Sequence, residues 1–204
     1  MNWLAHALLS PAEPEVRLGN LLADCLKGRD RQYVTKAFRL GLQLHAFIDR
    51  FTDSHPLVHR SIARLQGAYP LVGGILVDIF YDHLLTRRWA EHHPEPLDRF
   101  LQLLYDDLSH YAAVLPAELG EAVVGILRED RLGSYRRIEG IEAALRSVSR
   151  RLSVRTGRLF HLEDALGPML EQIDDYQADF EAFFPELRAA AEAHWQGCGI
   201  AGRV

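Results

Sequence analysis

Apolar residues recur three and four positions apart along most of the chain, and strict alternation of apolar and polar residues is rare. That period is typical of amphipathic helices and predicts an all-α protein, a single-domain helical bundle. Prolines and glycines mark the expected helix ends, because proline fits a first turn and glycine suits a C-terminal cap. The pattern predicts helices over residues 17–28, 33–52, 56–67, 74–91, 95–113, 117–129, 135–151 and 162–193.

Two polar residues interrupt the apolar face of the predicted helix 33–52. At about 100° per residue, His45 and Asp49 fall within the arc of apolar side chains and away from the charged face. They are four residues apart, so their side chains are neighbours on the helix surface. The pattern predicts that both point into the protein.

Similar pairs occur in two more segments. Asp78 and Asp82 are four residues apart in a predicted helix that is apolar almost all round, and His83 follows directly. Asn20 and Asp24 have the same spacing in the predicted helix 17–28. His6 lies in a separate short apolar segment. We therefore expect several inward-facing Asp and His side chains to meet.

Such a cluster raises an electrostatic problem. Burying one unpaired carboxylate costs several kcal/mol, roughly, and neighbouring carboxylates raise one another's pKa. A divalent cation would neutralise the cluster, and an Asp/His set without cysteine suits Mn²⁺, Fe²⁺, Mg²⁺ or Zn²⁺. The alternative is that each polar residue has an ordinary structural partner, for which the nearby cations are Arg17, Arg50, Arg87 and Arg88.

Length and composition limit the remaining possibilities. The 204 residues, 48% of them hydrophobic, fit one domain over residues 1–204, with a metal-site core at about 1–92 and a helical elaboration at about 93–196. No stretch is long and apolar enough for a membrane span, so we expect no membrane partner. Two cysteines give no disulfide framework, and no export leader is apparent, which favours a cytoplasmic location.

Charge is unevenly distributed along the chain. The net charge of -5 argues against nucleic acid as a partner. Residues 128–158, however, contain nine arginines and four acidic residues, so this segment carries about +5. It is either an ordinary solvated helix surface or a contact for an acidic partner.

Four strings, taken in order, resemble the acyl carrier protein phosphodiesterase family, and the resemblance extends over nearly the whole chain. They are Met1–His6 (MNWLAH), Gly19–Asp24 (GNLLAD), His45–Asp53 (HAFIDRFTD) and Asp78–Leu85 (DIFYDHLL). The resemblance implies removal of 4′-phosphopantetheine from holo acyl carrier protein, leaving the apo protein. It also implies a divalent cation, preferably Mn²⁺, and an all-helical fold related to the HD-domain metal phosphohydrolases. The family's polar positions match His6, Asn20, Asp24, His45, Asp49, Asp78, Asp82 and His83.

Two departures limit what the resemblance can supply. HD-domain enzymes carry adjacent His-Asp, whereas this chain reads Asp82-His83, so ligand roles cannot be copied from that superfamily. Cys25 stands where an aromatic residue is expected, which affects the pocket lining rather than the metal. Acyl carrier protein is acidic, so the resemblance also implies that the basic segment 128–158 binds it. The docking candidates are Arg136, Arg137, Arg150 and Arg151.

The site is therefore predicted in three parts. We expect the metal ligands to be Asp24, His45, Asp49, Asp82 and His83. Asp24 is a candidate for proton transfer, and Asp78 is either a further ligand or the general base, while His6 and Asn20 would orient the phosphate or the ligands. Arg50 or Arg87 would offset charge on the phosphate. Two other functions remain open, namely a phosphohydrolase for nucleotides or other small phosphoesters and a non-catalytic helical protein that binds an acidic partner.

Overall fold

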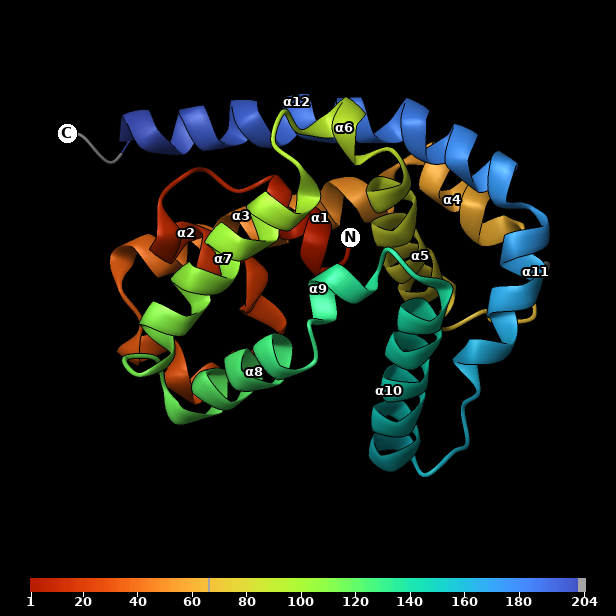
Figure 1. The fold of residues 1–204 in the computed structure, drawn as a ribbon, viewed down its shortest axis with the longest axis horizontal. Coiled ribbons are helices and arrows are strands. Elements are labelled where there is room, and N and C mark those ends of the chain that lie inside the picture. Colours follow the sequence, from red (N-terminus) through yellow and green to blue (C-terminus); the bar gives the residue numbers. More distant parts are fainter. Residues whose placement is uncertain (66, 202–204) are drawn as a thin grey trace.

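A computed structural model describes residues 1–65 and 67–201, and their regular secondary structure is entirely helical, which confirms the predicted all-α class. No helix among the described residues is long and apolar enough to cross a membrane. The elements (Figure 1) are α1 (Trp3–Leu8), α2 (Pro14–Leu21), η1 (Ala23–Cys25), η2 (Gly28–Tyr33), α3 (Lys36–Ser54), α4 (Pro56–Ala63), α5 (Gly73–Arg87), α6 (Trp89–His92), α7 (Leu97–Ala112), α8 (Ala117–Arg128), α9 (Arg131–Ser134), α10 (Ile138–Thr156), η3 (Leu162–Ala165), α11 (Leu166–Glu171) and α12 (Ile173–Ala201).

The predicted helix 17–28 is wrong at both ends. The helix begins at Pro14 and ends at Leu21, because Leu22 leaves the helical region (φ -100°, ψ 9°). Asp24 then lies in the short 3₁₀ turn η1. Asn20 and Asp24 are therefore not an i,i+4 pair on one helix, and the side chain of Asp24 is 75% exposed rather than buried.

Two other predicted helices are divided. The helix expected at 74–91 ends at Arg87, and Arg88 (φ -123°, ψ 33°) turns the chain so that Trp89 packs into the core and donates to the backbone oxygen of Glu95. The helix expected at 162–193 is η3, α11 and α12 in succession, with the break before α12 at Gln172. Pro168 lies in the first turn of α11, where its missing N–H costs nothing.

Helices α2 and α3 approach closely because each has a glycine at the crossing. A Cβ on Gly19 would lie 2.1 Å from the backbone oxygen of Phe38, and a Cβ on Gly41 would lie 2.1 Å from that of Val16. Any side chain at either position would force the helices apart. This close approach matters for the site, because it places the backbone oxygen of Asn20 within hydrogen-bond distance of His45.

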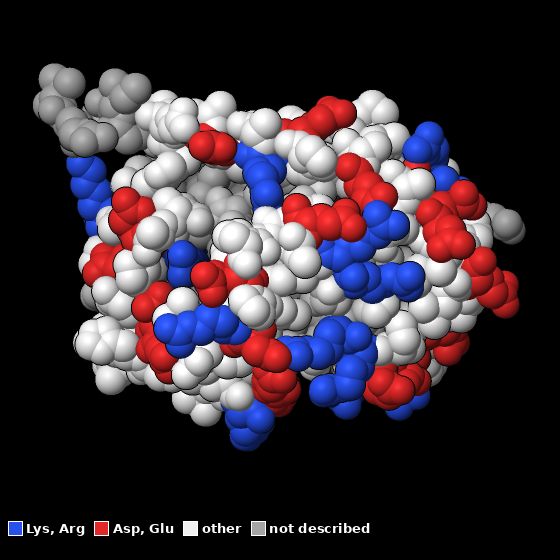
Figure 2. All heavy atoms as spheres, turned by 45° about the horizontal axis from the view of Figure 1, so that its top comes forward, with Lys and Arg blue, Asp and Glu red and all other residues white. Residues whose placement is uncertain are grey.

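Helix α12 runs along one side of the molecule across α3 and α4 (Figure 1). It contributes a row of fully buried side chains at helical spacing, namely Tyr176, Phe180, Phe183, Phe184 and Leu187. Asp179 is also fully buried and pairs with Arg60 of α4 and with Arg64, the residue that follows α4. On the face shown in Figure 2, acidic and basic side chains are interspersed.

Candidate metal centre

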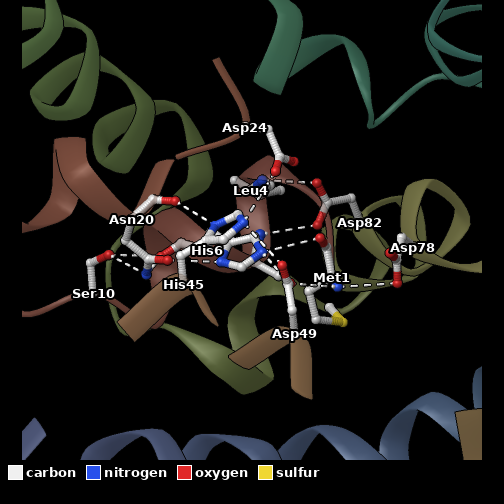
Figure 3. Close-up of polar contacts among 11 residues, drawn as sticks. Met1, Leu4, His6, Ser10, Asn20, Asp24, His45, Asp49, Asp78 and Asp82 are labelled. Carbon is white, nitrogen blue, oxygen red and sulfur yellow. Dashed lines mark hydrogen bonds and ion pairs between the residues drawn. The ribbon is translucent and has the colours of Figure 1, made fainter. Parts of the chain in front are cut away.

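His6, His45 and Asp49 converge from α1 and α3 (Figure 3). Nε2 of His6 lies 3.2 Å from Oδ1 of Asp49, and Nε2 of His45 lies 3.0 Å from Oδ2 of the same carboxylate. The two imidazoles stack with ring centroids 4.2 Å apart. One ligand atom from each residue lies within 4.8 Å of the others, which is a compact set of two nitrogens and one oxygen.

Asn20 fixes both imidazole rings. Its Oδ1 lies 2.8 Å from Nδ1 of His6, and its backbone oxygen lies 2.9 Å from Nδ1 of His45. The amide orientation is itself fixed, because Nδ2 of Asn20 donates to the backbone oxygen of His6 and to Oγ of Ser10. Both acceptors are oxygens, so each Nδ1 must carry the hydrogen. In the neutral rings, the lone pairs are therefore on Nε2.

This arrangement calls for positive charge between the rings and the carboxylate. Nε2 of His6 also lies 3.1 Å from the backbone oxygen of Met1. Nε2 lone pairs that face this oxygen and the carboxylate of Asp49 would place one acceptor against another, unless a proton or a cation lies between them. Burial lowers the pKa of His6. Burial also opposes protonation of His45, but the carboxylates of Asp24 and Asp49 outweigh this effect and raise the pKa of His45 to about 9. Burial opposes ionisation of Asp49, but its hydrogen bonds to the histidines hold its pKa low. The donors thus fit a divalent cation, held by imidazoles that Asn20 orients.

Three charged groups border this set. Asp24 places Oδ1 3.4 Å from Nε2 of His45, and its exposed carboxylate stays ionised because the hydrogen bond to His45 lowers its pKa. The Met1 α-amino group lies 3.1 Å from Oδ1 of Asp78 and 3.6 Å from Oδ1 of Asp49. Asp78 is thus linked to the ligand set through Met1, and Asp24 is the bordering carboxylate most open to solvent.

Asp82 and His83 are buried but engaged elsewhere. The carboxylate of Asp82 accepts the N–H groups of Leu4 (2.8 Å) and Ala5 (3.0 Å), so it caps the first turn of α1. Burial raises its pKa to about 7. His83 is not part of the group formed by His6, His45 and Asp49, and its Nδ1 lies 2.8 Å from the backbone oxygen of Tyr135. The structure therefore does not bring His83 to the other predicted ligands.

A cavity of about 960 Å³ adjoins the centre, and residues of α10 form part of its lining. It is reached from the ligand set through Met1, Asp24 and Asp78, which line it. Such a volume lies at the upper end of the roughly 300–1,000 Å³ typical of ligand pockets. A substrate in the cavity would therefore approach the centre past Asp24.

The predicted arginines divide into two groups. Arg137, Arg150 and Arg151 line the cavity, together with Arg131 and Arg155, which the sequence did not single out. Arg50, Arg87 and Arg136 do not line it. Arg50 and Arg87 are exposed, and Arg136 pairs with Asp98 at 2.7 Å. The nine-arginine count could have suggested Arg131 and Arg155, but not which arginines share the cavity.

Comparison with known proteins gives a consistent result. The family described as acyl carrier protein phosphodiesterase matches residues 1–187. Relatives named acyl carrier protein phosphodiesterase include those of Photorhabdus laumondii (28% identical over 94% of this chain and 96% of the relative) and Yersinia enterocolitica (28%, 94% and 98%). That of Escherichia coli is 27% identical over 94% of this chain and 97% of its own length. No solved structure matches significantly. The chain belongs to the acyl carrier protein phosphodiesterase family.

Proposed function

We propose that this protein hydrolyses the phosphodiester between 4′-phosphopantetheine and the serine of holo acyl carrier protein. Water attacks phosphorus, the bond to the serine oxygen breaks, and that oxygen takes up a proton. The products are apo carrier protein and 4′-phosphopantetheine. The observation that supports this most is the two-histidine, one-carboxylate set beside a large cavity, in a chain whose relatives are named for this reaction.

His6, His45 and Asp49 are the proposed metal ligands, with Asn20 orienting both histidines. A bound divalent cation would supply Lewis acidity toward the phosphate and make water a stronger acid. This proposal differs from the set expected from the sequence. His6 is added as a ligand, whereas Asp82 caps α1 and His83 bonds to the backbone oxygen of Tyr135.

Asp24 is the proposed proton acceptor. Its carboxylate is exposed in the cavity, borders the ligand set, and remains ionised at neutral pH because its pKa is lowered. Asp78 also lines the cavity, but its Oδ1 is paired with the Met1 α-amino group. We assign Asp78 to holding that amino group beside Asp49, and Asp24 to receiving the proton of the attacking water.

Three further parts of the proposal depend on the resemblance. Mn²⁺ is the proposed cation, with Mg²⁺ or Fe²⁺ as the alternatives for this nitrogen and oxygen donor set. The proposed location is the cytoplasm. The third part is the proposed relationship to HD-domain phosphohydrolases. In this chain the adjacent Asp82 and His83 do not share a metal, because Asp82 caps α1 and His83 bonds to the backbone oxygen of Tyr135.

The deciding experiment incubates purified protein and Mn²⁺ with holo carrier protein and follows the carrier by intact mass. Loss of the phosphopantetheine mass, with release of the free phosphorylated arm, is the expected result. Turnover of nucleotides or small phosphoesters alone would indicate a different phosphohydrolase. If the protein neither turns over substrate nor binds metal, the non-catalytic alternative holds.

A further inference from the structure

We propose that the C-terminal half of α10 is the docking surface for the carrier protein, with Arg150, Arg151, Val154 and Arg155 as its contacts. We call these four residues the α10 patch. This inference depends on the proposed function for the identity of the partner, an acidic protein that delivers a phosphodiester to the centre. It adds the surface that recognises that protein.

The α10 patch is a single helical face. Arg150 and Val154 are four residues apart, as are Arg151 and Arg155, so the four side chains are neighbours. All four are exposed. Between Glu142 and Glu163 the chain contains five arginines and no acidic residue. The face therefore presents concentrated positive charge.

The three arginines of the α10 patch have no carboxylate partner within the described part of the chain. Among the described residues, Arg150, Arg151 and Arg155 form no ion pair. By contrast, the arginines that pair with a carboxylate are Arg17, Arg60, Arg64, Arg88, Arg128, Arg131, Arg136 and Arg146. Unpaired like charges four residues apart weaken a helix slightly. An acidic partner would supply the missing carboxylates.

Exposed aliphatic side chains accompany this charge. Val154 is 87% exposed, and Leu159, in the loop after α10, is 85% exposed. These are the highest exposed fractions among the large hydrophobic residues described. Aliphatic residues among arginines fit an acidic protein face that also bears apolar side chains, whereas single-stranded nucleic acid calls for aromatic rings on which bases stack.

The α10 patch is also placed correctly relative to the centre. Its three arginines line the same cavity as Asp24. Arg151 and Cys25, the residue that follows Asp24, both line this cavity. The N-terminal half of α10 contributes only small residues to the cavity lining, apart from Glu139 in its first turn, which leaves room inside the cavity. They are Gly140, Ala143, Ala144 and Ser147. A carrier on the α10 patch would thus direct its prosthetic arm into the space beside Asp24.

The test measures binding separately from turnover. Calorimetry gives the Kd of the full-length protein for apo carrier protein, which lacks the scissile bond, at low and high salt. The variants are Arg150→Glu, Arg151→Glu and Arg155→Glu, alone and combined. Arg99→Glu on α7 is the matched control, because Arg99 is exposed, donates to Gln102, forms no ion pair with any described residue and lies outside the cavity. Unfolding curves identify any variant that loses helix α10.

We expect the combined variant to bind at least tenfold more weakly at low salt, and the difference to shrink as salt screens the charges. In turnover its KM should rise while kcat changes little. Binding equal to that of wild type, or an equal loss in Arg99→Glu, would overturn the inference. If wild type binds through these arginines but cleaves nothing, the proposed function fails and the docking surface stands. If the wild type cleaves holo carrier protein normally and the variants do not change this cleavage, the proposed function stands and the docking surface fails.

Discussion

Asn20 and His6 are joined by two hydrogen bonds. Oδ1 of Asn20 lies 2.8 Å from Nδ1 of His6, and Nδ2 of Asn20 donates to the backbone oxygen of His6 over 2.9 Å. Since the Asn20 backbone oxygen also accepts from His45, one residue fixes the tautomers of both proposed histidine ligands. The close crossing at Gly19 and Gly41 makes this possible.

Removing the Asn20 side chain should therefore weaken metal binding without removing a ligand. We expect Asn20→Ala to lose about 10–100-fold in Mn²⁺ affinity, the usual effect of losing an outer hydrogen-bond partner. Titration calorimetry with Mn²⁺ measures this. Ser10→Ala removes a partner of the amide and a hydrogen bond to the backbone oxygen of His6, but it leaves the Asn20 Oδ1 contact with His6 in place, so it should have a smaller effect. Unchanged affinity in Asn20→Ala would disprove the orienting role.

Asp49 is the proposed carboxylate ligand, because it faces both histidines. Asp49→Ala should abolish Mn²⁺ binding and turnover while far-ultraviolet circular dichroism still shows a helical protein. Asp53→Ala is the matched control, one turn later on α3 and exposed. It should retain both properties. Full activity in Asp49→Ala would show that the metal ligands lie elsewhere.

The roles of Asp24 and Asp78 can be separated by isosteric variants. Asp24→Asn should lower kcat by roughly 10²–10⁴-fold, the range for loss of a general base, with Mn²⁺ affinity nearly kept. Asp78→Asn should affect the Met1 ion pair instead, with a smaller loss of kcat. Steady-state kinetics and metal titration on both variants test the assignment, which a larger loss of kcat in Asp78→Asn would reverse.

Asp82 should behave as a structural residue. Asp82→Ala leaves the N–H groups of Leu4 and Ala5 unpaired, which should lower the free energy of unfolding by about 1–3 kcal/mol. Urea denaturation without metal measures this. If stability is unchanged but Mn²⁺ binding is lost, Asp82 is a ligand after all.

The same carboxyl predicts a dependence on pH. Burial raises the folded-state pKa of Asp82 to about 7, above the ordinary value near 3.9. The folded protein thus favours the neutral form, so this contribution to stability is complete below about pH 4 and is lost as pH rises to about 7. The stability of wild type relative to Asp82→Asn should fall over that window, and a constant difference would argue against the raised pKa.

Asp179 should show the opposite dependence. Its burial opposes ionisation, but hydrogen bonds from Arg60, Arg64 and Ser61 outweigh it and lower its pKa. Its contribution is therefore present above the unfolded pKa, near 3.9, and lost as pH falls through the lower folded value. Asp179→Asn should reduce the Tm at pH 7, with the difference from wild type narrowing in acid. Asp175→Asn, which removes only an exposed partner of Arg64, should change the Tm less.

The sequence by itself determined the helical class, because a period of three to four residues admits only one kind of local structure. It also identified His45 and Asp49 as a pair, since they lie four residues apart on one long helix, where His45 is buried and Asp49 is half-buried. Asn20 and His6 were recognised as polar residues in apolar segments, but their bonds to each other were not. These depend on α1 and α2 packing together, which periodicity within one helix cannot show.

Tertiary structure decided which of the polar residues meet. Asp82 and His83 lie on the same apolar helix as Asp78, yet one caps α1 and the other bonds to Tyr135, because those partners come from segments distant in sequence. Asp24 was expected to be buried on a helix that actually ends at Leu21. Likewise, Arg151 and Arg155 line the cavity while Arg50 and Arg87 do not, since each side chain's surroundings are set by how the helices pack.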